Sequence, residues 1–433
     1  MSRSDVPITP FPRLLAAMFS SNVGAFFALL TPLQLLLTLK VTTIAGTGAA
    51  AAFGVITGLG ALFALVANPI AGRISDRTAH RFGKRRTWIL TGSLAGSLVV
   101  FATAFTTEVW QVALFWCATQ AIFNVQLAAT AALFADQVPA ERRGTVSGMI
   151  GFAAAIGPLI GLAVVSAVSR PVVQWGIVAA VSVVLGALAV VLLRDAPASG
   201  RIGMRPGELL TSFWLNPWRH PAFGWAWLVR FLISCAYASN TYNAFFMMEQ
   251  FGIATDQVGG VVVIMSLIAV GLLAITSAVA GPISDRLRRQ KPFVIAAGVL
   301  TASAMVLMAT ATDTADVYVA SAVLGIGFGL FISVDNALSV RVLPSGDDAG
   351  KDLGIINLAN TLPQSVVPFI APFLLALGGF SALYATLAVL GVLGAGAVLR
   401  LPEVGREGDR RWAVITRLPA TVAAVPVPSE EIS

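Results

Sequence analysis

The chain consists of apolar runs of about 20 residues or more, separated by short polar segments. A bilayer core about 30 Å thick is crossed by roughly 20 residues of helix. Lipid offers no partner to unpaired backbone N–H and C=O groups, so each crossing run must be helical. The sequence predicts twelve such helices, near residues 13–39, 47–71, 87–106, 109–136, 143–169, 171–193, 222–248, 257–281, 292–311, 315–341, 350–377 and 380–400.

Composition supports a membrane protein and excludes an ordinary soluble one. Of 433 residues, 57% are hydrophobic and 11% are charged, and the mean hydropathy is +0.84. A soluble fold of this size could not keep so much apolar surface away from water. We therefore expect an all-α membrane protein.

The basic residues are unevenly distributed along the chain. All 28 Lys and Arg residues but three fall in the loops and tails on the N-terminal side of the membrane; the exceptions are Lys40, Arg170 and Arg230. Positive loops mark the cytoplasmic side. We expect a multi-pass plasma-membrane protein with both termini in the cytoplasm. The net charge of +7 then reflects topology, not nucleic-acid binding.

A polar, Pro- and Gly-rich segment at 194–221 divides the twelve runs into six and six. It is expected to be either a plain covering loop or a short amphipathic helix on the membrane surface. The predicted domains are an N-terminal six-helix bundle (1–193), a cytoplasmic linker (194–221), a C-terminal six-helix bundle (222–401) and a disordered cytoplasmic tail (402–433).

The two halves repeat at a nearly constant offset. Asp76-Arg77 reappears after 209 residues as Asp285-Arg286, and Pro139 reappears after 205 residues as Pro344. Gly148 and Gly354 are 206 residues apart. Such a repeat predicts two pseudo-symmetric bundles, a solute site at their interface near the membrane midplane, and alternating access by rocking of one bundle against the other.

The loop between the second and third predicted helices carries a specific motif, GRISDRTAHRFGKRR at 72–86. It resembles the loop signature of the major facilitator superfamily, in the longer form of the sucrose-proton symporters and the glycoside-pentoside-hexuronide cation symporters. ALFADQVPAERRGTVSG at 132–148 and GKDLGIINLANTLPQ at 350–364 resemble other segments of those symporters. The resemblance covers roughly residues 12–401 and implies the major facilitator fold and solute transport.

This loop and its abbreviated copy at 281–291 are expected to form a cytoplasmic latch. An Asp at a helix end can accept hydrogen bonds from the free N–H groups that begin a facing helix. The resemblance implies that Asp76 faces the helix starting near 350–353, and Asp285 the helix starting near 143–146. The predicted latch residues are Gly72, Asp76, Arg77, Arg81, Gly83, Asp285 and Arg286. Lys84, Arg85 and Arg86 are interpreted as setting topology only.

The fifth predicted helix contains GMIGFAAAIGPLIG at 148–161. Its Gly157-Pro158 core resembles the helix-five signature of drug-proton antiporters, although Leu162 departs from that pattern. Glycines at helical spacing also let two helices pack closely, and we prefer that interpretation. The motif keeps an exporter open as an alternative.

Two opposite charges are predicted to lie deep in the C-terminal half. At 1.5 Å per residue, Asp335 and Arg230 reach similar depths on the tenth and seventh helices, where they can pair. The pair is either a permanent structural ion pair or a site at which Asp335 exchanges a proton or accepts substrate hydroxyls. The stretch 119–130 inside the fourth helix has no carboxylate, which departs from the resemblance to proton-coupled sucrose transporters.

Neutral polar residues follow several predicted helices at helical spacing. Amides, hydroxyls and nearby aromatic rings suit a neutral, polyhydroxylated ligand, whereas interhelical hydrogen bonding is the alternative. The candidate cavity residues are Asn22, Gln34, Gln120, Asn124, Tyr237, Asn240, Thr241, Asn357, Thr361 and Gln364.

No motif for enzymatic chemistry, for a cofactor or for a metal is found, and no Walker loop for ATP. We therefore expect a non-enzymatic secondary transporter of a sugar or glycoside, working as a monomer with proton or sodium symport. A drug or metabolite exporter and a transporter-derived ligand sensor are the alternatives.

Overall fold

The computed structural model describes residues 9–76, 78, 82–139, 142–195, 220–287, 290–341, 359 and 362–401. All regular elements in these ranges are helices. The N-terminal half contains α1 (Phe11–Thr31), α2 (Leu37–Ala45), α3 (Ala49–Asp76), α4 (Lys84–Thr103), α5 (Val109–Gln137), α6 (Arg143–Ser166) and α7 (Pro171–Leu192). The C-terminal half contains α9 (Pro221–Ala238), α10 (Asn243–Phe251), α11 (Val258–Leu287), α12 (Lys291–Thr310), α13 (Thr314–Arg341) and α15 (Pro363–Ala397).

Nine spans among the described residues are long and apolar enough to cross a membrane. One of them, of 57 residues, contains two crossings, because α1 continues through a π-helical turn at Pro32–Leu36 into α2 and is followed by α3. The last span also contains two, because Gly378 and Gly379 leave the helical conformation within α15. The helix α4 begins with three basic residues and adds a further crossing. Each of the twelve predicted crossings therefore contains described helix, although residues 350–358, 360 and 361 of the eleventh lie outside the described residues.

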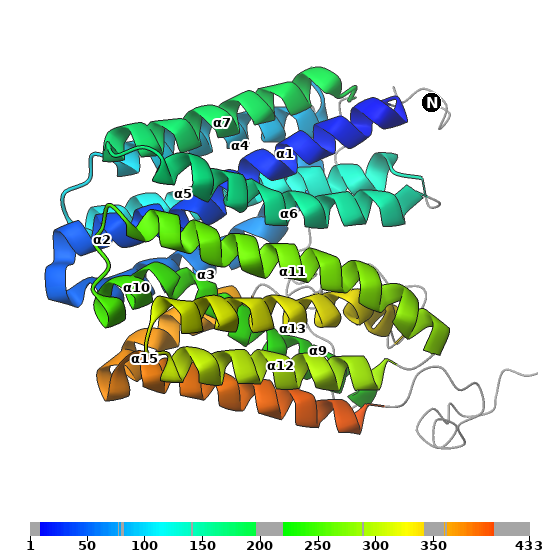
Figure 1. The fold of residues 1–433 in the computed structure, drawn as a ribbon. Coiled ribbons are helices and arrows are strands. Elements are labelled where there is room, and N and C mark those ends of the chain that lie inside the picture. Colours follow the sequence, from blue (N-terminus) through cyan, green and yellow to red (C-terminus); the bar gives the residue numbers. More distant parts are fainter. Residues whose placement is uncertain are drawn as a thin grey trace, which may run out of the picture.

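The helices form two bundles with matching internal packing (Figure 1). In the first bundle α3 packs on α5, and α4 packs on both α5 and α7. In the second, α11 packs on α13, and α12 packs on both α13 and α15. The bundles meet along α3 with α15 and along α6 with α11. This pseudo-symmetric arrangement confirms the fold that the repeat predicts.

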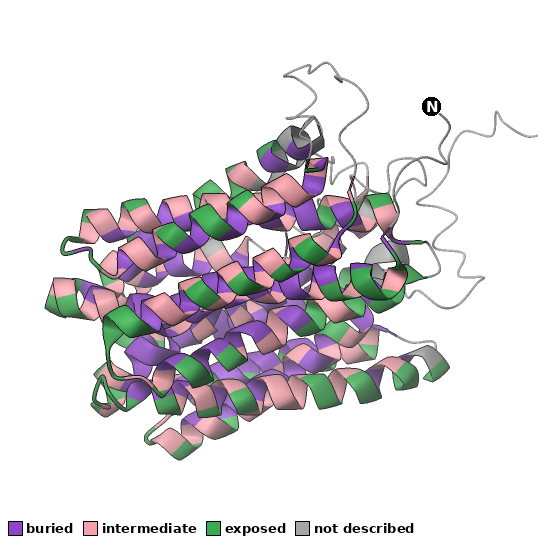
Figure 2. Ribbon diagram, turned by 90° about the horizontal axis from the view of Figure 1, so that it is seen from above, coloured by how far each residue is buried: buried purple, intermediate pink, exposed green. Residues whose placement is uncertain are grey.

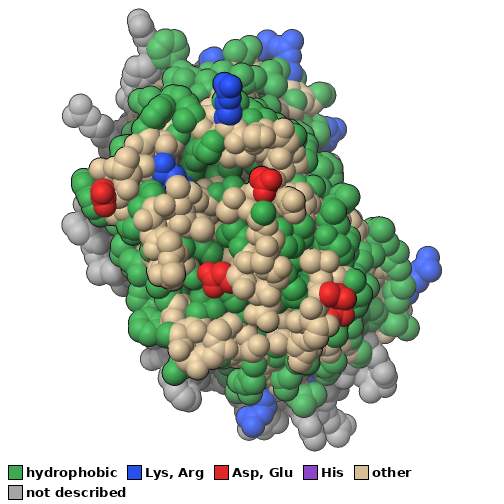
Figure 3. All heavy atoms as spheres, turned by 60° about the vertical axis from the view of Figure 1, so that its left-hand side comes forward, with side chains coloured by type: hydrophobic (Ala, Val, Ile, Leu, Met, Phe, Trp, Pro, Cys, Tyr) green, Lys and Arg blue, Asp and Glu red, His purple; other side chains and the backbone are tan. Residues whose placement is uncertain are grey.

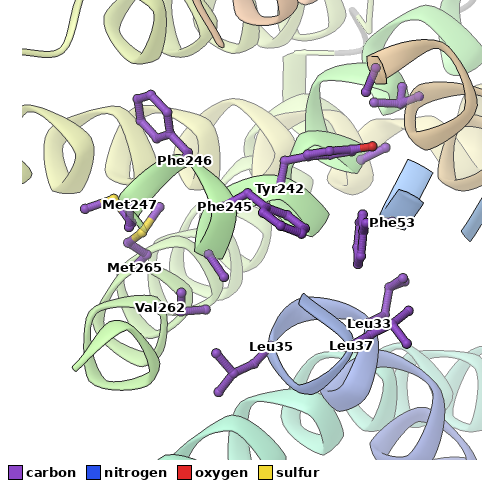
Figure 4. Packing of buried hydrophobic residues seen from close by; sticks show 14 of the residues in the cluster. Leu33, Leu35, Leu37, Phe53, Tyr242, Phe245, Phe246, Met247, Val262 and Met265 are labelled. Carbon is purple, nitrogen blue, oxygen red and sulfur yellow. The ribbon is translucent and has the colours of Figure 1, made fainter. Parts of the chain in front are cut away.

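The two ends of the molecule differ in how their cores are joined. We call the end with Pro10, Leu193, Pro221 and Leu401 the tail end, and the other the hairpin end. At the hairpin end one buried cluster draws residues from both bundles (Figure 4). At the tail end the described residues form two separate clusters, one in each bundle. Among the described residues, the two bundles therefore share one core at the hairpin end and have separate cores at the tail end.

Exposed positions follow the outer faces of the helices (Figure 2), and many of them are large hydrophobic residues, as a lipid-facing surface requires. Leu377 is 82% exposed, Val191 76% and Leu98 69%. Short polar segments close the hairpin end, where the described acidic residues are Glu108, Glu249, Asp256, Asp313 and Asp316 (Figure 3).

Lys40 is a basic residue at the hairpin end, and it has a local partner. Its Nζ donates a hydrogen bond of 2.8 Å to the carbonyl of Ala104, which caps the C-terminus of α4. A cation at this position satisfies a free helix carbonyl and complements the helix dipole. Lys40, one of the three exceptions to the basic-residue pattern, thus has a structural role.

Candidate solute-binding cavity

A cavity of about 320 Å³ lies between the two bundles. Its walls come from α1 and α6 on one side and from α9, α11, α13 and α15 on the other. The volume is near the lower end of the range for small-molecule sites, roughly 300–1,000 Å³. Five of the residues proposed from sequence line it: Gln34, Tyr237, Asn240, Thr241 and Gln364.

Most polar groups of the cavity come from the C-terminal bundle. Two lining residues, Asn243 and Ser266, were not predicted from sequence. Between α9 and α10 the chain forms a 3₁₀ segment, Ser239–Tyr242. Because a 3₁₀ helix has three residues per turn, Asn240 and Asn243 fall on the same face. Asn243 Nδ2 donates a hydrogen bond of 3.3 Å to Asn240 Oδ1.

An aromatic pair adds a flat surface to the same wall. The rings of Tyr237 (α9) and Phe328 (α13) are stacked, with centroids 4.1 Å apart and an interplanar angle of 8°. Both residues line the cavity. The opposite wall is apolar, and its α6 residues are Gly151, Ala154, Ala155, Pro158, Leu159 and Leu162.

The predicted charge pair is formed. Arg230 on α9 and Asp335 on α13 make an ion pair with an Nη2–Oδ2 distance of 2.8 Å, and both side chains are buried. Asp335 lies three residues beyond Ile332, which lines the cavity. Residues three apart on a helix are neighbours, so the pair lies about one turn from the cavity, toward the tail end.

Three other predicted cavity residues, Asn22, Gln120 and Asn124, do not line this cavity. The amides of Asn22 and Asn124 donate to carbonyls of their own helices, those of Met18 and Gln120. An amide that satisfies the preceding helical turn does not need to point into a cavity. Asn357 and Thr361 lie outside the described residues.

The latch motif is only partly described. Gly72 and Asp76 belong to α3, and Asp285 and Arg286 to the last turn of α11. The side chains of Asp76 and Asp285, the residues Arg77 and Arg81, and the segment 350–353 lie outside what the structure describes. The latch therefore stays a prediction.

Gly83 and Asp195 form the start of α4. Asp195 Oδ2 accepts hydrogen bonds from the backbone N–H groups of Arg85, at 2.5 Å, and Arg86, at 3.0 Å. Gly83 has φ of +101°, and a Cβ there would lie 2.6 Å from the same carboxylate oxygen. Glycine is required at this position both for its backbone conformation and for the close approach of Asp195.

Arg85 does more than set topology, so that interpretation is wrong for this residue. Its guanidinium is buried and donates to Ser75 Oγ at 2.6 Å and to Asp136 Oδ2 at 3.0 Å. Lys84 also pairs with Asp136 at 3.0 Å. Burial opposes ionisation of Asp136, but the hydrogen bonds and charges of Arg85 and Lys84 outweigh it and lower its pKa. The cluster ties α3, α4 and α5 together.

The glycines of α6 serve helix packing. A Cβ on Gly157 would lie 3.2 Å from the carbonyl oxygen of Val23, and one on Gly161 would overlap Thr31; both neighbours belong to α1. Pro158 faces the cavity from the same helix. The motif thus brings α6 close to α1, as the packing interpretation expects.

The hairpin end is closed above the cavity by aromatic and backbone contacts between the bundles. Phe53 of α3 lies edge-on to Tyr242 and Phe245, at centroid distances of 5.3 Å and 5.1 Å (Figure 4). The next residue, Gly54, leaves no room for a Cβ, which would be 2.6 Å from the carbonyl oxygen of Pro368 on α15.

Comparison with solved structures shows the same fold. A mutant of the nucleoside transporter NupG matches with a TM-score of 0.69 and 15% identity, over 89% of this chain and 99% of that one. A D-xylose-proton symporter matches with a TM-score of 0.65 and 17% identity, over 90% and 98%. A bacterial homolog of the human lysosomal transporter Spinster, in an inward-facing and occupied conformation, matches with a TM-score of 0.66 and 14% identity, over 89% and 95%.

No curated protein gives a significant sequence match. The sequence does match the family model described as Major Facilitator Superfamily, over residues 13–346 and 239–425. Together these matches span nearly the whole set of described helices. The chain is therefore a multi-pass membrane transporter that belongs to the major facilitator superfamily.

Proposed function

We propose that this protein is a secondary active transporter of a small neutral polar solute, a sugar or glycoside, which it moves across the plasma membrane by alternating access. The observation that carries the proposal is the cavity between the bundles. Its described lining offers amides, hydroxyls and an aromatic surface and includes no ionisable carboxylate, ammonium or guanidinium group. Such a lining supplies hydrogen bonds to a neutral polyol without attracting ions.

The distribution of charge supports an orientation with the tail end in the cytoplasm, because basic residues gather there. We propose that the described residues then correspond to an inward-facing state, in which the contacts of Phe53 close the outer side. A solute in the cavity would leave toward the cytoplasm between the two separate tail-end cores. Import along this path is the direction that we propose.

Coupling to a proton, or to sodium, is assigned to the Arg230–Asp335 pair. A buried carboxylate near a solute site is costly unless it is paired, and separation of the pair on solute binding would make protonation of Asp335 favourable. In the described helices of the N-terminal bundle no ion pair occupies an equivalent buried depth. We therefore propose that coupling occurs in the C-terminal bundle.

The test is uptake into proteoliposomes of radiolabelled glucose, galactose, xylose and their methyl glycosides, under an imposed proton or sodium gradient. Asp335→Asn should abolish gradient-driven uptake while leaving solute counterflow. Asp316→Asn, in the first turn of the same helix, is the matched control and should leave both unchanged. Gradient-driven uptake that survives in Asp335→Asn would rule out coupling at this residue.

An exporter is the second candidate, and the apolar α6 wall favours it, because apolar drugs would bind there. The same vesicles distinguish the two. If no sugar or glycoside enters and a fluorescent dye is extruded in exchange for protons, the exporter replaces the proposed importer.

A further inference from the structure

One cavity-lining polar group is buried without a hydrogen-bond partner. Asn243 is 4% exposed and lines the cavity, and its Oδ1 has no partner among the described residues. Its Nδ2 is engaged with Asn240 Oδ1, which fixes the orientation of the amide. A buried acceptor without a partner is unfavourable, and a ligand that brings a donor would satisfy it.

The two walls of the cavity differ in polarity. Polar side chains on the C-terminal side come from α9 and α10, the 3₁₀ segment between them, α11 and α15. On the N-terminal side Gln34 is polar, whereas the described α6 wall around Ala155, Pro158 and Leu159 is entirely apolar. A solute with hydroxyl groups all round would leave donors and acceptors unpaired against α6.

We infer that the cavity takes an amphipathic neutral solute, with a hydroxyl or N–H donor directed at Asn243 Oδ1 and an apolar substituent against Pro158 and Leu159 of α6. For a sugar this means a glycoside with an apolar aglycone. The inference rests on the proposed function and goes beyond it by fixing which face of the solute meets which bundle. The cavity of about 320 Å³ suits one polar ring with one small apolar substituent.

The test compares matched methyl and phenyl β-glycosides of glucose, galactose and xylose in proteoliposome uptake. The wild-type protein should transport the phenyl glycoside with a kcat/KM roughly tenfold above that of the methyl glycoside, because an apolar contact discriminates by about this factor. Equal values, or a preference for the methyl glycoside, would overturn the inference and leave sugar transport standing. Uptake of none of these solutes would instead overturn the proposed function.

Variants of single residues test the contribution of each cavity wall to binding. Leu159→Thr should lower kcat/KM for the phenyl glycoside more than for the methyl glycoside and so remove the phenyl preference, whereas Ile160→Thr, at the neighbouring 48% exposed position, should change neither value. Asn243→Ala should raise KM for both glycosides by the same factor, roughly tenfold. If Asn243→Ala does not fold, the comparison of phenyl and methyl glycoside uptake by Leu159→Thr tests the proposal by itself. A loss of the same size for both glycosides in Leu159→Thr would contradict the arrangement.

Discussion

At the scale of single residues, Arg230 and Asp335 form an ion pair in which both partners are buried, whereas Asp136, the partner of the buried Arg85, is 33% exposed. Both residues are less than a tenth exposed, and their side chains meet at 2.8 Å. Separating a buried pair by removing one partner leaves an uncompensated charge, whereas replacing both partners by apolar residues removes the desolvation cost as well.

We therefore predict that Asp335→Leu lowers the free energy of unfolding by about 3 kcal/mol. The double variant Arg230→Met with Asp335→Leu should recover most of that loss, because neither charge is then left buried alone. Thermal unfolding of the purified proteins in detergent measures the change in stability of the single variant and of the double variant. Additive losses in the double variant would show that the two charges do not depend on each other.

Asp136 gives a pH-dependent prediction. Because Arg85 and Lys84 lower its pKa in the folded state, the ionised carboxylate stabilises the fold above the unfolded-state pKa, near 4. That contribution disappears as the pH falls through the folded-state pKa. Asp136→Asn should cost about 1 kcal/mol at pH 7, a modest value because the side chain is 33% exposed to solvent.

The measurement is the difference in Tm between wild type and Asp136→Asn from pH 7 down to pH 3. The difference should narrow below about pH 4, where the wild-type carboxylate becomes protonated. Asp256→Asn, at an exposed position of the hairpin end, is the control and should show little difference at any pH. If the difference in Tm between wild type and Asp136→Asn stays constant down to pH 3, the ionised carboxylate of Asp136 does not stabilise the fold.

At the scale of elements, the apolar runs determine the helices, and their positions could be predicted from sequence because each run matches the thickness of the membrane. The pairing of Arg230 with Asp335 could be predicted as well, since helical rise places both at one depth. Interruptions of the α-helix could not be predicted from the sequence. The 3₁₀ turn that brings Asn243 onto the face of Asn240 has no marker in the sequence.

Side chains that hydrogen-bond within their own helix are a second reason why the cavity residues could not all be predicted from sequence. Asn22 and Asn124 follow the helical stripes expected of a cavity, yet their amides bond to their own backbone. Arg85 looked like one of several interchangeable topology signals, whereas its partner Asp136 lies 51 residues away in sequence. Contacts between distant segments cannot be read from the motif alone.

The contact of Asp195 with the start of α4 is an interaction between distant segments that can be tested by substitution. Asp195→Ala should remove the acceptor of two backbone N–H groups and cost about 1 kcal/mol. Gly83→Ala should cost more, because it adds a strained backbone conformation to a clash with the same carboxylate. Combining the two changes should cost less than their sum, since Asp195→Ala makes room for the new methyl group. Thermal unfolding of the three variants checks the order.

At the scale of the whole molecule, the described cores of the two bundles are joined at the hairpin end and separate at the tail end. The proposed alternating access requires the hairpin end to open as the tail end closes. Gly54→Leu should shift this equilibrium toward opening at the hairpin end, because the side chain cannot fit against Pro368 and Pro372. Gly271→Leu on α11, where a Cβ meets no neighbour within 4 Å, is the matched control.

The most direct test of the account is the accessibility of the cavity itself. Ser266→Cys places a thiol in the cavity lining, in a background with Cys117→Ala and Cys235→Ala. A membrane-impermeant maleimide should label it from the tail side, a transported glycoside should slow that labelling, and Gly54→Leu should add labelling from the hairpin side. Labelling at equal rates from both sides in the Ser266→Cys protein, or no protection by a transported solute, would contradict a binding cavity that opens to one side at a time.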